Sequence, residues 1–344
     1  MKIAIDAMGG DHGPPVTIGG LTDALNLFPE LEATVFGLEE STLPHLKNHG
    51  LIRNNRVDFE HSSEIVKMDD KPAIALRSKK DSSMRRAIDS VKSGGSNACV
   101  SAGNTGALMG IARFVLKTMP GISRPAICGT MPGIEKTTKL LDLGANVDCS
   151  SEDLLGFAIM GSVLARFTSG IEQPRVALLN IGMEQIKGNE QIRKASEILE
   201  KSHINYVGYV EGDDIFKGSV DVIVCDGFIG NIALKASEGA AKMLSEIAKE
   251  EYSKNLLTKL SGLLSLPVLG QLKERVDPRR HNGASLLGLK GTVVKSHGSA
   301  DELSFSHAIQ VAISETKQKI PEKIGELMGE TEFALGDSSN ARKS

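Results

Sequence analysis

Residues 98–117 read ACVSAGNTGALMGIARFVLK, and the fold prediction starts from the pattern in this stretch. The short apolar run from Ala98 to Ser101 predicts a buried strand. Glycines at 103 and 106 predict a tight turn, because glycine permits close backbone approaches. From Ala107 to Lys117 the apolar residues recur at helical spacing. The stretch therefore predicts a strand, a glycine-rich turn and a helix in succession.

The same succession occurs along most of the chain. Strand-like runs at 2–7, 175–180 and 220–225 each lead into a loop with glycine and then into a helical pattern, the last expected over 231–249. Strands that alternate with helices of this length are typical of βαβ units. The predicted fold class is α/β, with a mostly parallel sheet covered on both faces. We expect a single domain over 1–332 and a flexible tail at 333–344.

Composition excludes several classes of protein. The 344 residues carry 40 Lys and Arg against 43 Asp and Glu, so the net charge of −3 excludes a generally basic nucleic-acid binder. No stretch approaches the roughly 18 apolar residues of a membrane-spanning helix. The four cysteines form no C-x-x-C pair, so we expect buried reduced thiols. Asp6, Asp142 and Asp226 lack compact ligand spacing, and no metal site is predicted.

Residues 252–281 depart from the α/β pattern. One face of a predicted helix carries leucines, namely Leu256, Leu257, Leu260, Leu263 and Leu264. Pro267 is expected to break or kink this helix, and Arg279 and Arg280 make its far end cationic. The residues alone leave two interpretations open. The segment is an ordinary surface or dimer helix, or it is an amphipathic excursion that contacts a membrane or a partner.

Loops after the strands hold the candidate site residues. In a parallel sheet, ligands bind at the carboxyl ends of strands, where helix N-termini offer N–H donors to anions. Lys187 is either a solvated surface charge or a cation that meets a bound anion. Asn104 and Asn231 are each either a helix N-cap or an amide donor to an oxyanion. His297 is expected to be structural.

Familiar nucleotide and hydrolase signatures are absent from the sequence. There is no G-x-x-x-x-G-K-[ST] loop, no G-x-G-x-x-G after the first strand and no G-x-S-x-G elbow. The glycine-rich loops alone therefore do not identify a ligand.

Six longer strings together resemble the bacterial phosphate acyltransferases of phospholipid synthesis, which act on acyl-carrier protein and phosphate. The strings are IDAMGGDHGP (5–14), ACVSAGNTGALMG (98–110), LDLGANVDC (141–149), ALLNIG followed by KG (177–188), VCDGFIGN (224–231) and GASLLGLKGTVVKSHG (283–298). They span most of the chain and together are far more specific than any one alone.

The resemblance implies a three-layer α/β/α sandwich like that of isopropylmalate dehydrogenases and phosphotransacetylases, assembled as a homodimer. It implies that a long-chain acyl-[acyl-carrier-protein] thioester and inorganic phosphate give acyl phosphate and free acyl-carrier protein, without a cofactor. The acyl phosphate then serves the glycerol-3-phosphate acyltransferase of the membrane. We therefore expect a cytoplasmic enzyme held peripherally at the inner face of the cell membrane, with no nucleic-acid partner.

With this resemblance, the loop residues take roles in the reaction. Phosphate is already an anion, so the enzyme must orient it and stabilise an oxyanion rather than activate a nucleophile. We expect Lys187 to hold phosphate, with Asp226 orienting it, and Asn231 to donate to the thioester oxygen or to phosphate. The other expected substrate contacts are Gly103, Asn104, Thr105, Gly106, Asp226 and Gly230. The expected contacts to membrane or carrier protein are Leu256, Leu260, Leu263, Leu264 and Arg279.

Three alternatives remain. A short-chain phosphotransacetylase using coenzyme A shares the expected fold and chemistry. A metal- and nicotinamide-dependent decarboxylating dehydrogenase shares the fold but needs clustered metal-binding aspartates. A non-enzymatic scaffold would bind acyl-carrier protein through residues 252–281 and form no acyl phosphate.

Overall fold

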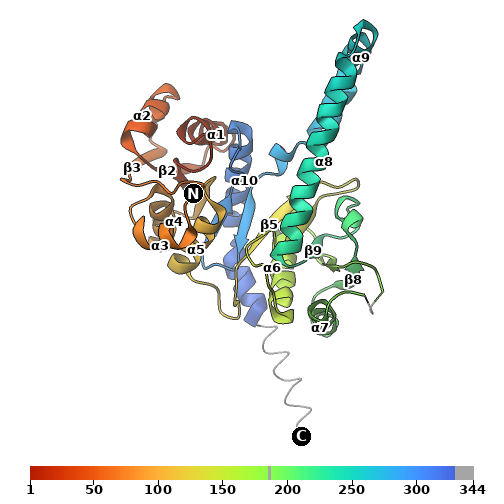
Figure 1. Ribbon diagram of the computed structural model, residues 1–344. Coiled ribbons are helices and arrows are strands. Elements are labelled where there is room, and N and C mark those ends of the chain that lie inside the picture. Colours follow the sequence, from red (N-terminus) through yellow and green to blue (C-terminus); the bar gives the residue numbers. More distant parts are fainter. Residues whose placement is uncertain (185–186, 330–344) are drawn as a thin grey trace.

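The computed structural model describes residues 1–184 and 187–329, with the backbone alone at 273, 275 and 276. Within these residues, eleven strands form one sheet with helices on both faces (Figure 1). The strands are β1 (Lys2–Asp6), β2 (Glu32–Gly37), β3 (Val57–His61), β4 (Ala98–Ser101), β5 (Ala126–Met131), β6 (Thr138–Leu141), β7 (Val176–Leu179), β8 (Tyr206–Val210), β9 (Val222–Val224), β10 (Ala284–Leu287) and β11 (Thr292–Lys295).

Helices accompany these strands in the described ranges: the ten labelled α-helices given next, a further helical segment at 320–329, and three short 3₁₀-helices. The α-helices are α1 (Pro14–Leu27), α2 (Glu39–Asn48), α3 (Pro72–Ser78), α4 (Ser83–Ser93), α5 (Thr105–Leu116), α6 (Ser151–Ser169), α7 (Glu190–Leu199), α8 (Gly227–Ser253), α9 (Leu256–Val276) and α10 (Glu302–Gln318). The 3₁₀-helices are Leu51–Arg53, Gly212–Phe216 and Pro278–His281.

The alternation of side chains along each strand builds a core on both faces of the sheet. In β1, Ala4 packs on the face covered by α4 and α5, whereas Ile3 and Ile5 pack on the face covered by α1 and α10. Successive residues of a strand point to opposite faces, so a strand that is apolar throughout is buried on both. The predicted α/β class and three-layer arrangement are therefore confirmed.

The two halves of the sheet run in opposite directions. β3, β2, β1, β4 and β11 pair in parallel in one half, and β6, β9, β7 and β8 pair in parallel in the other. Antiparallel pairs of β10 with β11 and β5, and of β5 with β6, join the halves. The candidate loops therefore divide between two edges of the sheet and do not share one carboxyl edge. Loops 9–11, 102–106 and 296–299 lie at one edge, and the loops that begin at 142, 180 and 225 lie at the other.

Helices α8 and α9 form a hairpin that projects from the body of the molecule (Figure 1). Asn255 caps α9, because its side chain accepts a hydrogen bond from the Thr258 N–H at 3.0 Å. The two helices approach closely at Gly262, where a Cβ would lie 2.9 Å from the Tyr252 ring. Helix α9 continues through Pro267, so a break there is excluded, and the alternative of a kink stays a prediction.

Other sequence predictions have mixed outcomes. All four cysteines are buried free thiols, as expected. Helices α2 and α3 and strand β10 were not predicted. The expected tail at 333–344, and the domain boundary before it, lie outside the described residues. Within the ranges described, no helix combines the length and apolar character needed to cross a membrane.

Candidate active site

A buried polar cluster lies where β1, β4 and β11 end. The hydroxyls of Ser83 and Ser101 each donate to a different oxygen of Asp6, both at 2.6 Å. Burial raises the pKa of Asp6, although the serine hydrogen bonds oppose this effect. Burial lowers the pKa of Lys295 to about 8, while the charge of Asp6 opposes that change. Two ionisable side chains, Asp6 and Lys295, are therefore buried beneath the loops at this edge of the sheet.

Lys295 joins two of these loops. Its Nζ donates to the carbonyl oxygen of Ala102 at 3.1 Å and to that of Ser296. The Asp11 N–H donates to the Gly298 carbonyl at 2.8 Å, and a Cβ on Gly298 would lie 2.9 Å from the Met68 Cε. Loops 9–11, 102–106 and 296–299 and the Met68 segment thus form one continuous surface.

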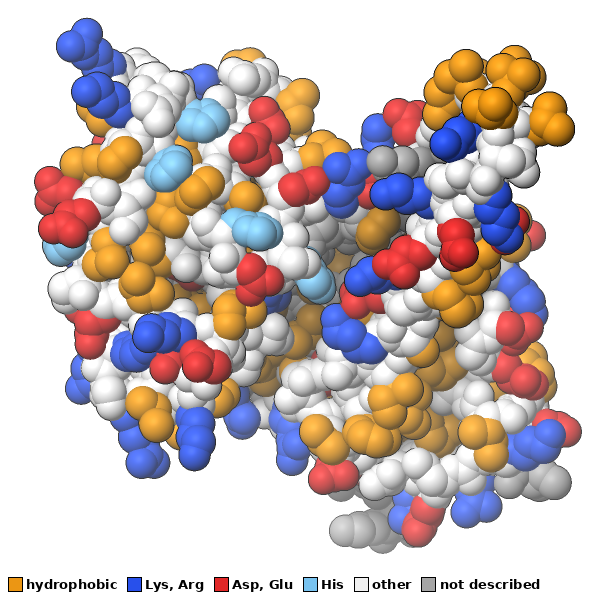
Figure 2. All heavy atoms as spheres, turned by 45° about the horizontal axis from the view of Figure 1, so that its top comes forward, with side chains coloured by type: hydrophobic (Ala, Val, Ile, Leu, Met, Phe, Trp, Pro, Cys, Tyr) orange, Lys and Arg blue, Asp and Glu red, His pale blue; other side chains and the backbone are white. Residues whose placement is uncertain are grey.

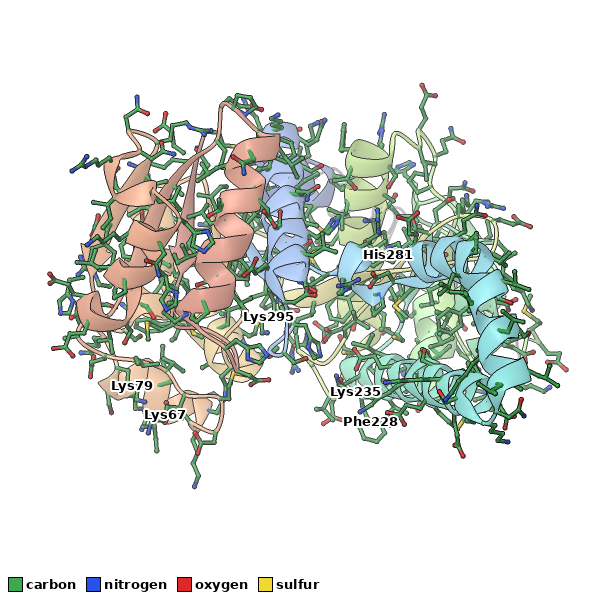
Figure 3. All side chains as sticks on the ribbon, turned by 90° about the horizontal axis from the view of Figure 1, so that it is seen from above. Lys67, Lys79, Phe228, Lys235, His281 and Lys295 are labelled. Carbon is green, nitrogen blue, oxygen red and sulfur yellow. The ribbon has the colours of Figure 1, made fainter. Side chains whose placement is uncertain are left out.

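Helix α8 faces this surface. Asn231, Lys235 and Glu238 recur at the spacing of one helix face, and the Lys235 Nζ lies 2.7 Å from a Glu238 carboxylate oxygen. Burial and the charge of Lys235 lower the pKa of His297, whereas Glu238 acts in the opposite direction. Lys235 also lowers the pKa of Lys295. Lys295 and Lys235 come from the two sides of this space (Figure 3).

The surface is hollowed between the loop edge and α8 (Figure 2). We call this hollow the central cleft, bounded by loops 102–106 and 296–299 and by the face of α8 that carries Asn231 and Lys235. Two lysines and a histidine lie at its border, and Glu238 pairs with Lys235 there. Such a cleft can hold an anion close to backbone donors.

The Asn104 side chain has a structural role at the start of α5. Its Oδ1 accepts from the Ala107 N–H at 2.9 Å, and its Nδ2 donates to the carbonyls of Met68 and Asp70 at 2.6 and 3.1 Å. The N-cap interpretation of Asn104 is therefore confirmed, and its direct contact with substrate stays a prediction.

The backbone N–H groups of loop 102–106 differ in whether they already have a hydrogen-bond acceptor. The Gly103 N–H donates to the Ser101 hydroxyl at 3.0 Å. The N–H groups of Thr105 and Gly106 have no acceptor in the part of the chain that the structure describes, and both residues are exposed. They are the donors that the α5 N-terminus can offer to an anion in the cleft.

Asn231 is not a helix cap. α8 begins at Gly227, and its N-cap is Asp226, whose carboxylate accepts from the Ile229 N–H at 2.8 Å. Asn231 lies in the second turn with an exposed side chain. The N-cap interpretation of Asn231 is wrong because an earlier residue suited to capping starts the helix, and its amide is available to a ligand.

Gly230 allows α8 to pack closely on the loop after β6. A Cβ at this position would lie 2.0 Å from the carbonyl oxygen of Asp142. Its own N–H donates to the Asp226 carbonyl at 3.0 Å, inside the helix. The predicted substrate contact of Gly230 is untested, but its structural role is to set the position of Asn231.

Lys187 lies on the opposite edge of the sheet from the lysine-rich border of the cleft. Its Nζ lies 2.9 Å from a carboxylate oxygen of Glu184, and 46% of its side chain is exposed. Among the described residues, no hydrogen bond or ion pair joins it to Asp226 or Asn231. In this structure Asp226 caps α8 and Glu184 pairs with the lysine, and the expectation that Asp226 orients Lys187 stays a prediction. Contact of Lys187 with phosphate stays a prediction.

The predicted leucines of the hairpin are exposed. The exposed fractions are 85% for Leu256, 55% for Leu260, 61% for Leu263 and 75% for Leu264, and hydrophobic side chains gather at the hairpin tip (Figure 2). Within this chain, the leucines are therefore not core residues.

Arg279 is held by two carboxylates, and 39% of its side chain is exposed. Its guanidinium donates to both oxygens of Asp277 and to Asp301 at 2.9 Å. These hydrogen bonds raise its pKa. The residue therefore anchors the base of the hairpin, and its predicted contact with a membrane or carrier protein is untested.

Sequence reasoning missed Lys235 and Lys295 and treated His297 as structural. One signal for Lys295 was available in the sequence. This lysine ends the apolar strand run GTVVK and directly precedes Ser296 and His297. No comparable signal marked Lys235, which occupies an ordinary helical position. No group of three or more His, Cys, Asp or Glu side chains in the described ranges is placed to hold a metal ion.

Comparison with known proteins shows the family. A family model described as fatty acid synthesis protein matches residues 1–323. The phosphate acyltransferase of Methylococcus capsulatus is 56% identical over 326 residues, which are 95% of this chain and 96% of that protein. The phosphate acyltransferase of Halorhodospira halophila is 51% identical, covering 97% and 99% of the two chains.

Solved structures support the fold. A phosphotransacetylase from Streptococcus pyogenes aligns with a TM-score of 0.59 and 17% identity, covering 92% of this chain and 94% of that one. A branched-chain phosphotransacylase from Enterococcus faecalis aligns with a TM-score of 0.54 and 15% identity, covering 92% and 99%. At such identities the likeness shows the fold alone. From its sequence relatives, the chain belongs to the phosphate acyltransferase family and is an acyltransferase.

Proposed function

We propose that this enzyme transfers a long-chain acyl group from the thioester of acyl-carrier protein to inorganic phosphate, and that the acyl phosphate feeds glycerol-3-phosphate acylation. The names of its relatives and of the matching family model support the phosphate acceptor and the lipid context. The identity of the donor as acyl-carrier protein goes beyond these names and is part of the proposal.

The observation that carries the proposal is the set of groups around the central cleft. The N–H groups of Thr105 and Gly106 lie on one side with Lys295 and His297, and Lys235 lies on α8 opposite. In the proposed reaction, a phosphate oxygen attacks the thioester carbonyl carbon, the C–S bond breaks and the carrier thiolate leaves. The enzyme needs only to hold the anion and stabilise the oxyanion.

Asn231 is the proposed donor to that oxyanion or to phosphate. Its amide is exposed on the same face of α8 as Lys235, one turn earlier. Lys187 is a proposed second phosphate contact, which requires its ammonium group to leave Glu184 and its loop to approach the cleft from the opposite edge of the sheet. The backbone of Gly103 to Gly106, with Asn104 as its cap, is the proposed wall against phosphate or the acyl group.

Direct attack by phosphate, without an acyl-enzyme, fits the chemistry of the side chains. Burial raises the pKa of Cys128 and Cys149 to about 12 and raises those of Cys99 and Cys225 well above the usual value. A thiolate nucleophile is therefore disfavoured. The Ser101 hydroxyl donates to buried Asp6 and is held away from solvent.

The hairpin is the proposed route by which an apolar product reaches a membrane. We propose that the exposed leucines of α9 enter an anionic membrane surface reversibly, so that the enzyme works in the cytoplasm at the inner face of the membrane. We also propose a homodimer, in which exposed apolar residues of α8 pack against a second copy. These residues are Met243, Leu244 and Ile247.

The testing experiment measures acyl phosphate formation from purified protein and phosphate with a series of C2 to C18 donors. Each acyl group is supplied on acyl-carrier protein and on coenzyme A. The proposal expects the highest kcat/KM with long-chain acyl-carrier protein. Preference for acetyl-coenzyme A would instead establish the short-chain phosphotransacetylase alternative, and carrier binding without acyl phosphate formation would establish the scaffold.

A further inference from the structure

The chain concentrates positive charge in one segment. Residues 67–117 contain ten Lys and Arg but only four Asp, in a protein whose overall net charge is −3. Three of these cations, Lys79, Arg85 and Arg86, form ion pairs with carboxylates. Six further cations are exposed and, among the described residues, form no ion pair: Lys67, Lys71, Arg77, Lys80, Arg113 and Lys117. We call these six residues the basic face.

An open groove lies within the basic face, between α3 and α5. Its volume is about 380 Å³, and it is lined by Leu76, Gly110, Arg113, Phe114, Lys117 and Thr118. The Phe114 side chain is 54% exposed, and the Lys117 Nζ lies 4.8 Å from its ring centroid. A Cβ on Gly110 would meet nothing within 4 Å, so the groove floor is unfilled there. An apolar anchor bordered by cations is typical of a protein-binding surface rather than of a purely solvated face.

The groove and the central cleft lie along the same helix, α5. Helix α5 lines the groove and starts at Thr105, beside the cleft, and its 12 residues span about 18 Å. At that end, a Cβ on Gly106 would lie 2.8 Å from Pro72, the first residue of α3. Lys67 precedes Met68, whose side chain reaches the loop at Gly298. Lys67 and Lys79 project from this lobe, on the same side of the molecule as Phe228 and Lys235 (Figure 3).

We propose that the basic face is the docking surface for the acidic carrier protein that brings the acyl thioester. This inference rests on the proposed function and names the surface that selects its donor. Carboxylates on a helix of the carrier pair with the exposed cations, an apolar carrier residue packs on Phe114, and the flexible thioester arm enters the cleft past Gly106. Charge complementarity of this kind steers encounter and fixes orientation.

The position of the basic face favours a protein partner over lipid. The exposed leucines that suit a membrane lie at the hairpin tip, and α3 and α5 lie on the body of the molecule away from that tip (Figure 1). A membrane surface that reached both regions at once would have to contact two distant parts of the molecule.

The test reverses two charges at the groove. Arg113→Glu with Lys117→Glu is compared with Arg193→Glu and Lys201→Glu, two exposed cations in and just after α7 that give the same change in net charge. For each protein, kcat/KM is measured with a palmitoyl group on acyl-carrier protein and with the same group on pantetheine, which lacks the carrier. Circular dichroism melting checks the fold, and Lys71→Glu with Lys80→Glu replaces the groove pair if that variant unfolds.

The inference predicts a drop of about tenfold or more in kcat/KM for the carrier-bound donor at low salt, mainly through KM, as expected for loss of electrostatic steering. The pantetheine donor and the α7 variant stay at wild-type values, and added salt narrows the difference. Equal losses with both donors, or none, overturn the docking surface. Loss of binding to anionic vesicles with unchanged carrier kinetics would assign the basic face to lipid and also overturn it. If wild-type protein makes no acyl phosphate from any carrier-bound donor, the proposed function fails and this inference falls with it.

Discussion

Gly230→Ala tests whether close packing of α8 positions the active site. The added Cβ would lie 2.0 Å from the carbonyl oxygen of Asp142 and 2.9 Å from the Cys225 sulfur. Ordinary contacts begin at about 3.4 Å, so the helix start and the loop after β6 must separate by more than 1 Å. Overpacking typically costs about 1–3 kcal/mol, and we expect the upper end because the obstructing atom belongs to the backbone.

Gly239→Ala is the matched control in the same helix. A Cβ there meets nothing within 4 Å, so only helix propensity acts, and it favours alanine by about 1 kcal/mol. Urea unfolding followed by circular dichroism should show Gly230→Ala destabilised and Gly239→Ala equal to or more stable than wild type. Gly230→Ala should also lose turnover, since Asn231 moves with the helix. A Gly230→Ala protein with wild-type stability and activity would refute this packing argument.

Three further predictions concern separate parts of the molecule. Asn231→Ala should lower turnover by about 10²–10³ at unchanged stability, whereas Asp226→Ala should lose about 0.5–2 kcal/mol of stability with the N-cap; near-wild-type turnover in the first removes Asn231 from the mechanism. Leu260→Glu with Leu264→Glu should abolish co-sedimentation with anionic vesicles at low salt while the protein stays folded and active, and unfolding instead would place the leucines in an interface. Burial raises the pKa of Glu315 from 4.5 to about 7, so the folded state retains a proton that the unfolded state loses between those pH values. The free energy of unfolding should therefore fall by about 3 kcal/mol as pH rises from 4.5 to 7, and Glu315→Gln should flatten this part of a urea-unfolding pH profile; an unchanged slope contradicts the assignment.

Much of the fold could be predicted because each strand–turn–helix unit is a local pattern. The run before Gly103 and the helix after Gly106 were placed from sequence alone, and the structure has them as β4 and α5. The direction of the second half of the sheet depends on long-range pairing. One signal was available, because only six residues separate Met131 from Thr138. A parallel pair needs a crossover of about a dozen residues or more, so this short connection requires an antiparallel turn.

The site was less predictable than the fold. Asn231 was selected as a candidate, but its helix position was misjudged because Asp226 caps the helix earlier. Lys235 and His297 become neighbours only when α8 crosses toward the edge formed by β4 and β11, a contact between segments about 60 residues apart. Spacing along the sequence carries no information about such a contact, whereas the excess of lysine and arginine at 67–117 was visible in the sequence and was overlooked.

Direct transfer of the acyl group to phosphate is the central claim, and a single-turnover experiment tests it most directly. Enzyme in excess is mixed with radiolabelled palmitoyl-[acyl-carrier-protein], first without phosphate and then with it, and samples are quenched in acid. The account predicts that the label stays on the carrier until phosphate is added and then appears in acyl phosphate, with none on the enzyme. Label on the enzyme before phosphate is added would contradict direct attack, and label that never leaves the carrier would contradict the proposed reaction.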